Sequence, residues 1–228
     1  MRKMIIAAAL LAAACATAPA AAPAPAPQTN GGAVSPVPAA IAPADGTSLN
    51  PADAPAGAYT MDPRHASVVW RVRHTGLSLF TARFDTFEGA LNFDPQNPAN
   101  SSVTASIAAN SVSTNVVNRN GEHAFDHDIA NTLGAEANPN ITFVSRSIEL
   151  TGPTTGLITG DLTLNGQTHP ATLEASFHGG RFIQLRGKNV IAFSARTIIN
   201  RSQWGVTNWA LFTGDQVEIL IDAEFIKD

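Results

Sequence analysis

Apolar side chains recur at every second position in about eight short segments of the chain. In residues 67–73, for example, Val68, Trp70 and Val72 alternate with polar residues. Alternate residues of a β-strand point to the same face, so this pattern is typical of a sheet with one buried face. The alternation recurs in residues 86–93, 103–107, 141–143, 158–164, 173–177, 193–195 and 217–225. We therefore predict about eight strands.

Turn-forming residues separate these segments. Asn165-Gly166 stands between the apolar runs 157–164 and 171–177, which is the usual signature of a tight hairpin. Antiparallel strands of this number and length can close into a barrel, which removes exposed sheet edges and encloses an apolar interior. The predicted fold class is all-β, an antiparallel barrel of about eight strands. Its interior is either filled by side chains or hollow enough for one small ligand.

Residues 121–133 break this alternation. Phe125, Ile129 and Leu133 recur every four residues with acidic residues between them, as in a short amphipathic helix. Gly134 is a suitable residue to end it. A helix inserted between strands can cover one mouth of a barrel.

Composition divides the chain into two parts. All 15 aromatic residues lie between Tyr59 and Phe225, and residues 58–228 are long enough for one domain with its own core. In this domain 12 Lys and Arg residues stand against 16 Asp and Glu residues, so the basic surplus that nucleic-acid binding requires is absent. Only two of those bases are lysines, which also disfavours a polybasic membrane-binding patch.

The first 15 residues resemble a secretory signal peptide. A basic start is followed by the apolar run Met4–Ala14, which is shorter than the ~20 residues of a membrane-spanning helix. Cys15 follows a sequence that resembles the lipobox of bacterial lipoproteins, in which the cysteine is acylated. Ordinary cleavage at Ala14-Cys15-Ala16, leaving a soluble protein, is the alternative. We expect export to the periplasm, with membrane contact only through an acyl group on Cys15.

Residues 16–57 contain 15 Ala and 9 Pro among 42 residues. Alternating Pro and Ala favour extended polyproline II over a packed core. This segment is predicted to be a disordered tether ahead of the domain at 58–228. Because Cys15 is the chain's single cysteine, no intrachain disulfide can form.

Motifs of common catalytic and nucleotide-binding sites are absent from the sequence. His123 and His127 have the spacing of metal ligands on a helix, but a solvated helix face is the favoured interpretation, because metal sites need three or four ligands. We therefore expect no metal, no required cofactor and no catalytic residue. An enzyme is the alternative if Asp62, His65 and His74 converge in a cavity.

The alternating apolar positions, together with clustered aromatic residues, favour an elongated apolar ligand, which requires a mostly hydrophobic cavity with few polar groups. The predicted cavity residues are Val68, Trp70, Val72, Phe84, Phe87, Leu91, Phe93, Phe125, Ile129, Phe143, Leu162, Leu164, Phe177, Phe193 and Trp204.

Eight ordered motifs in residues 58–226 resemble those of the YceI-like family. They are Tyr59–His65, Trp70 with His74, Phe84–Gly89, Phe93–Pro95, Ser111–Thr114, Pro139–Ser145, Gly160–Gly166 with Pro170, and Asn200–Gly205 with Gly214–Val217. Two positions depart from the pattern: Ala66 replaces a serine, and the helical segment replaces an R-D-x-H-L motif. Phe125, Ile129 and Leu133 therefore stand in the segment where other members of the family carry the residues of that motif.

The family contains exported bacterial proteins with a lipocalin-like barrel that bind polyisoprenoid chains or similar amphiphilic lipids. The resemblance implies that this chain holds an isoprenoid or quinone-like lipid, in a storage, transport or envelope-stress role. His74 and Arg201, which stand in matching motifs, are candidates for contact with a polar head group, and an ion pair within the protein is the alternative for Arg201. A filled barrel that acts in envelope structure or assembly, without a ligand, is another alternative, and a homodimer is left open.

Overall fold

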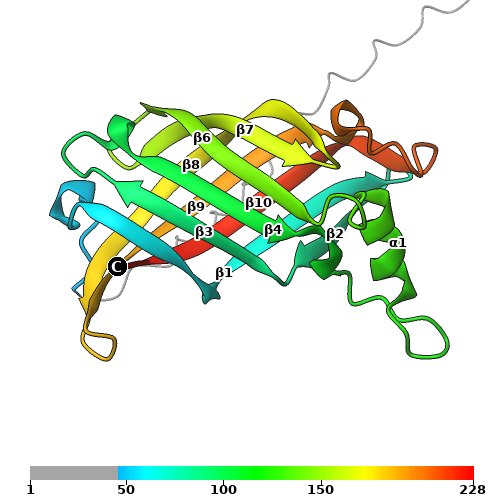
Figure 1. The fold of residues 1–228 in the computed structure, drawn as a ribbon, viewed down its shortest axis with the longest axis horizontal. Coiled ribbons are helices and arrows are strands. Elements are labelled where there is room, and N and C mark those ends of the chain that lie inside the picture. The colour runs from blue at the N-terminus through cyan, green and yellow to red at the C-terminus, as the bar shows by residue number, and fades with distance from the viewer. Residues whose placement is uncertain (1–45) are drawn as a thin grey trace, which may run out of the picture. The chain divides into compact units, whose positions relative to one another are not determined.

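The computed structural model describes residues 46–228 (Figure 1). The predicted signal peptide, with Cys15, and most of the predicted tether lie outside the described residues. Eight strands form a ring: β1 (Gly57–His74), β3 (Phe87–Phe93), β4 (Ser102–Ala108), β6 (Asn140–Leu150), β7 (Thr155–Leu164), β8 (Gln167–Ile183), β9 (Lys188–Asn200) and β10 (Thr213–Lys227).

Pairing between the first and last strands closes the ring. Each strand is antiparallel to its neighbour, and β10 returns to β1 in a register that runs from Tyr59 opposite Lys227 to His74 opposite Thr213. Each strand of the ring is therefore paired on both sides over at least part of its length. This closure removes the open sheet edge at which proteins commonly aggregate. The predicted all-β barrel is confirmed.

The long strand β1 has two successive partners on one side. Its first residues pair with β3, whereas Val68–His74 pair with the additional strand β2 (Ser78–Phe84). The chain bends at Asp85-Thr86 between β2 and β3, and the short strand β5 (Val112–Ser113) pairs with β2. This arrangement extends the barrel wall at the end that carries the helix (Figure 1).

The predicted hairpin and helix are both present. Asn165 and Gly166 have φ values of 51° and 71° and join β7 to β8, as a two-residue hairpin requires. Helix α1 (Ala124–Thr132) lies at one end of the barrel (Figure 1), and Gly134 follows it with φ of 71°. No helix within residues 46–228 is both long and apolar enough to cross a bilayer.

The described part of the predicted tether contacts the barrel. Ser48 forms a β-bridge with Gly180 of β8, residues Pro51–Asp53 form a 3-10 helix, and Ala54 is buried. The hydroxyl of Tyr59 donates a hydrogen bond to the Pro55 carbonyl over 2.6 Å. These contacts hold residues 48–57 against the domain, although their Ala and Pro content indicates an unpacked chain.

Candidate ligand-binding site

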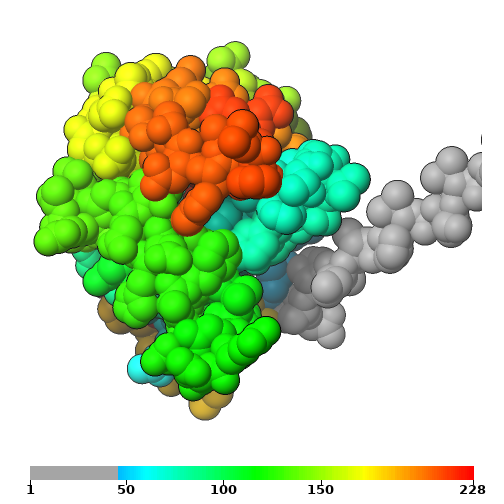
Figure 2. Space-filling model, turned by 90° about the vertical axis from the view of Figure 1, so that its right-hand side faces the viewer, coloured from blue at the N-terminus to red at the C-terminus, as the bar shows by residue number. Residues whose placement is uncertain are grey.

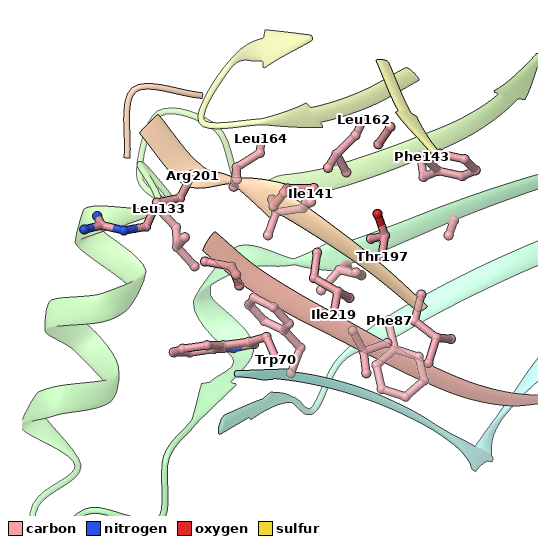
Figure 3. A pocket seen from close by; sticks show the side chains of 18 of the residues that line it. Trp70, Phe87, Leu133, Ile141, Phe143, Leu162, Leu164, Thr197, Arg201 and Ile219 are labelled. Carbon is pink, nitrogen blue, oxygen red and sulfur yellow. The ribbon is translucent and has the colours of Figure 1, made fainter. Parts of the chain in front are cut away.

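The barrel encloses a main cavity of about 520 Å³. Its volume is typical of small-molecule sites, which span roughly 300–1,000 Å³. Side chains from most strands and from α1 project into it (Figure 3), and most of them are apolar. They include Val68, Trp70, Val72, Phe80, Phe84, Phe87, Phe143, Leu162, Leu164, Ile219 and Phe225.

Most of the predicted cavity residues line this main cavity. These are Val68, Trp70, Val72, Phe84, Phe87, Phe125, Ile129, Phe143, Leu162 and Leu164, together with the polar candidates His74 and Arg201. Leu91, Phe93, Phe177 and Phe193 instead line a second cavity of about 120 Å³. Trp204 lines neither cavity; its side chain is fully buried, and its Nε1 donates to the Leu162 carbonyl over 3.0 Å.

A thin apolar partition separates the two cavities. Val103, Ile158 and Phe225 line both of them, so these three side chains mark the far end of the main cavity. Behind the partition, the ring of Phe193 lies 6.2 Å from that of Phe225 and 5.3 Å from that of Phe177. Aromatic contacts of this kind stabilise a fixed wall.

The mouth of the main cavity lies at the α1 end. Phe125 of α1 projects between two other aromatic residues, with ring centroids 5.8 Å from Phe80 and 5.9 Å from Trp209. The side-chain amide of Asn208 donates to the Thr132 hydroxyl over 3.1 Å and joins the segment 205–212 to the end of α1. Helix and segment together partly cover the mouth.

Helix α1 is fixed to the barrel near its first turn. The carboxylate of Asp126 accepts hydrogen bonds from the Thr114 backbone N–H, over 3.0 Å, and from the Thr114 hydroxyl. His123 lies 3.3 Å from the same carboxylate. His127 is exposed, and within residues 46–228 it belongs to no close group of three metal-ligating side chains.

Arg201 is buried, with an exposed fraction of 7%, and it makes no ion pair among the described residues. Its guanidinium donates to four backbone carbonyls, those of Val206, Asn208, Thr213 and Gly214, over 2.7–3.1 Å. An arginine has five N–H donors. One donor is therefore left for a ligand, and the other four hold the segment 206–214 in place.

The indole of Trp70 brings an unpaired donor to the cavity. Its Nε1 is buried and has no hydrogen-bond partner among the described residues. A buried donor without a partner costs roughly 1–3 kcal/mol. An acceptor on a bound molecule would remove that cost. Thr197 places its hydroxyl on the cavity side of β9 and adds a second polar group (Figure 3).

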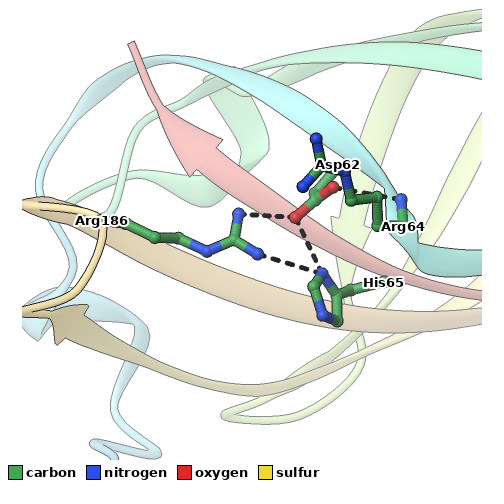
Figure 4. A network of polar contacts seen from close by, with 4 residues as sticks. All are labelled: Asp62, Arg64, His65 and Arg186. Carbon is green, nitrogen blue, oxygen red and sulfur yellow. Dashed lines mark hydrogen bonds and ion pairs between the residues drawn. The ribbon is translucent and has the colours of Figure 1, made fainter.

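Asp62, His65 and Arg186 form a polar cluster that lines neither cavity (Figure 4). Asp62 Oδ2 lies 2.6 Å from Arg186 Nη1 and 2.9 Å from His65 Nδ1, and Oδ1 accepts from the Arg64 backbone N–H. Burial raises the pKa of Asp62, but the hydrogen bonds from His65, Arg186 and Arg64 outweigh burial and lower the pKa to about 2.

The position of this cluster tests the alternative in which Asp62, His65 and His74 form an enzyme active site or hold a metal ion. His74 is the last residue of β1 and lines the main cavity, whereas Asp62 and His65 lie further back along the strand and do not line it. The three residues therefore do not converge in one cavity, as acid–base chemistry would require. Glu224 could join Asp62 and His65 as a cation ligand, but Arg186 already neutralises Asp62.

The fold and the site define a class of protein: a closed antiparallel barrel that surrounds an apolar cavity and carries a helix at one mouth. A family model described as the YceI-like domain matches residues 59–225, and the chain belongs to this family. The predicted family membership is confirmed.

Curated relatives match over most of their length. A UPF0312 protein of Pseudomonas aeruginosa is 32% identical over 164 residues, which cover 72% of this chain and 83% of the relative. Protein YceI of Escherichia coli O157:H7 is 34% identical over the same coverage.

Solved structures share the fold. BcnA of Burkholderia cenocepacia has a TM-score of 0.63 at 20% identity, over 72% of this chain and 98% of BcnA. A Campylobacter jejuni YceI protein has a TM-score of 0.57 at 23% identity, over 68% and 90%. A Saccharophagus degradans structure described as a polyisoprenoid-binding domain has a TM-score of 0.52 at 14% identity, over 75% and 99%.

Sequence reasoning missed several residues of the main cavity. Phe80 alternates with Ala82 and Phe84 in β2, and this short period-two pattern was a usable signal. Trp209 has φ of 55° in an irregular segment and lines the mouth. No periodic pattern predicts its position, because the segment 205–212 is irregular and is held by hydrogen bonds from the Arg201 side chain to the Val206 and Asn208 carbonyls.

Proposed function

We propose that this protein holds an isoprenoid or similar long-chain amphiphilic lipid inside its barrel, as a binding protein rather than an enzyme. The observation that carries the proposal is the main cavity of about 520 Å³, lined mostly by apolar side chains. Each buried CH₂ group contributes about 0.8 kcal/mol of transfer free energy. A hydrocarbon chain would therefore bind there without a charged anchor.

The position of the polar groups gives the ligand a direction. Trp70, His74, Arg201 and Asn208 line the cavity toward α1, whereas Val103, Ile158 and Phe225 close its far end. A bound lipid with its polar head at the mouth and its apolar tail toward the partition would match the polar residues at one end of the cavity and the apolar residues at the other. The structural neighbour from Saccharophagus degradans is a polyisoprenoid-binding domain, which agrees with this ligand class.

In the alternative, a barrel filled by side chains, the core would have no space for a lipid chain. The main cavity favours a binding role over that alternative. Storage, transport and envelope-stress roles all remain within the proposal, since each needs only that the lipid be held away from water.

Mass spectrometry of the protein purified without unfolding tests this function. The expected result is a stoichiometric, extractable long-chain lipid. Recovery of lipid-free protein from cells that contain polyisoprenoids, together with failure of that protein to take up a polyprenol from detergent micelles, would contradict it. Phe143→Trp places a larger side chain in the cavity and is expected to lower the bound fraction, and Phe182→Trp, on an exposed position outside both cavities, serves as its control.

Export belongs to the same proposal and is supported by the sequence of residues 1–15. The protein would reside in the periplasm, either free or attached through an acyl group on Cys15. Fractionation of cells that express the full chain or its Cys15→Ser variant separates the two forms. Acylation predicts that a larger share of the full chain than of the variant is recovered with the membrane.

A further inference from the structure

Five exposed apolar residues surround the mouth of the main cavity: Leu77, Leu79, Trp209, Leu211 and Phe212. We refer to them as the apolar rim. Leu211 and Leu77 are 92% and 81% exposed. The rim belongs to two segments, residues 75–79 (the β1–β2 turn and the start of β2) and residues 205–212, which lie beside α1 at the same end of the barrel (Figure 2). Exposed apolar side chains that cluster in this way mark a contact surface.

The two segments form one continuous surface with the cavity. The backbone N–H of Thr75 donates to the Phe212 carbonyl over 2.6 Å and ties the turn to the second segment. Asn208 and Trp209, which stand three and two residues before the rim's most exposed leucine, Leu211, line the main cavity itself. A molecule that leaves the cavity at this end therefore passes the apolar rim.

Hydrogen bonds hold the rim outward. Arg201 binds four carbonyls between Val206 and Gly214, and Arg73 Nη1 donates to the Leu77 carbonyl over 2.9 Å. Thr75 and Gly76, with φ of 49° and 73°, form a tight hairpin turn that places Leu77 beyond the strands. The backbone of both segments is thus fixed, and the leucines cannot fold back over the mouth.

The charge of the rim indicates which partner it fits. Residues 75–79 and 205–212 contain no Asp, Glu, Lys, Arg or His. An uncharged surface that carries leucine, phenylalanine and a half-exposed tryptophan matches the interface of a zwitterionic bilayer, where such side chains are favoured. It has no basic residues for anionic lipid headgroups and no paired charges for a polar protein partner.

We propose that the apolar rim docks the barrel, mouth first, on the surface of a lipid bilayer, so that a lipid passes between membrane and cavity without crossing water. This inference rests on the proposed function, because only a membrane-resident ligand needs such a contact. It adds the surface through which that ligand enters and leaves.

The full chain allows a site-specific test because Cys15 is its single cysteine. In a Cys15→Ser background, which cannot be acylated, Leu211→Cys is labelled with a polarity-sensitive dye. Leu185→Cys, a 101% exposed leucine in the β8–β9 turn at the opposite end, is the matched control. On addition of phosphatidylcholine vesicles, the dye at position 211 is expected to report an apolar environment and the dye at 185 to remain in water.

Three results of the labelling would overturn the proposal. They are no change at position 211, the same change at both positions, and a change at 211 that follows protein concentration without vesicles. The last result would assign the rim to a second copy of the chain.

Lipid transfer gives an independent measurement. Leu211→Asp with Phe212→Asp is expected to slow the loading of a polyprenol from phosphatidylcholine vesicles by at least about tenfold, since two exposed apolar side chains that docking would bury in the bilayer are lost. Leu185→Asp with Phe182→Asp should load like the parent. Both variants should load equally from detergent micelles, which require no docking. Equal loading from vesicles would refute docking and leave the binding function intact, whereas no loading from either source would count against the binding function itself.

Discussion

The ring of Phe125 lies 5.9 Å from the indole of Trp209, and this contact joins α1 to the segment 205–212 across the mouth of the main cavity. Phe125 also packs 5.8 Å from Phe80 on the barrel wall. Phe125 therefore links the helix both to Trp209 of the apolar rim and to the barrel wall, and opening the mouth requires these contacts to break.

Phe125→Ala is expected to speed the release of a bound polyprenol by roughly two- to tenfold, because an aromatic pair contributes about 0.5–1.5 kcal/mol beyond burial. Transfer of the lipid to excess vesicles, followed over time, measures this rate. Phe182→Ala, which removes an exposed phenylalanine at the other end of the barrel, serves as the control. An unchanged release rate would show that α1 does not gate the mouth.

The partition at Phe225 sets the length of chain that the cavity can hold. Phe225→Ala joins the main cavity to the second cavity, so the bound lipids are expected to shift toward longer chains. Phe177→Ala enlarges the second cavity and leaves the partition in place. Both substitutions should cost about 3–5 kcal/mol of stability. Mass spectrometry of bound lipids should distinguish them, and an identical chain-length distribution in the two variants would disprove this role of Phe225.

The unpaired indole N–H of Trp70 predicts a preference for ligands with a hydrogen-bond acceptor. Trp70→Phe is expected to weaken the binding of a polyprenol by roughly two- to tenfold, since a net hydrogen bond contributes about 0.5–1.5 kcal/mol. Binding of the corresponding hydrocarbon without oxygen should change little. Titration of both compounds measures the ratio, and an equal loss for both would mean that Trp70 acts only through packing.

The low pKa of Asp62 predicts a loss of stability in acid. Because the folded-state value of about 2 lies below the unfolded value of 3.8, the ionised carboxylate stabilises the fold above pH ~4, and this contribution disappears as the pH falls toward 2. The contribution is on the order of 1 kcal/mol, because His65 and Arg186 are partly exposed and screened by water.

Arg186→Gln removes one of the groups that lower this pKa. The variant should be less stable than the parent at pH 7. The difference should shrink as the pH falls from about 4 and should vanish only below pH 2, once Asp62 is protonated in both. Urea unfolding at a series of pH values gives the comparison. A stability difference that does not depend on pH would show that Arg186 acts through packing and not through the charge of Asp62.

The barrel and most of its interior face could be predicted from the sequence, because period-two alternation depends only on which face of a strand is buried. Val68, Trp70 and Val72 follow this rule and all line the main cavity. The pattern does not give a residue's height along the barrel axis. Phe177 and Phe193 alternate in the same way, yet they lie beyond the partition and line the second cavity.

Polar contacts that depend on the path of an irregular segment or turn could not be predicted. Arg201 stood as a candidate for a head group or an ion pair, but its burial among four backbone carbonyls arises from the path of residues 206–214. The pairing of Asp62 with Arg186 joins residues 124 positions apart and depends on a turn between β8 and β9 that no local pattern places near β1.

The central claim is that a lipid chain occupies the main cavity, and a crystal structure of protein purified without refolding tests it most directly. We expect continuous tubular electron density that begins near Trp70 and His74 at the mouth and ends at Ile158 and Phe225. A cavity that contains only separate water molecules, or side chains that have collapsed to fill it, would contradict the account.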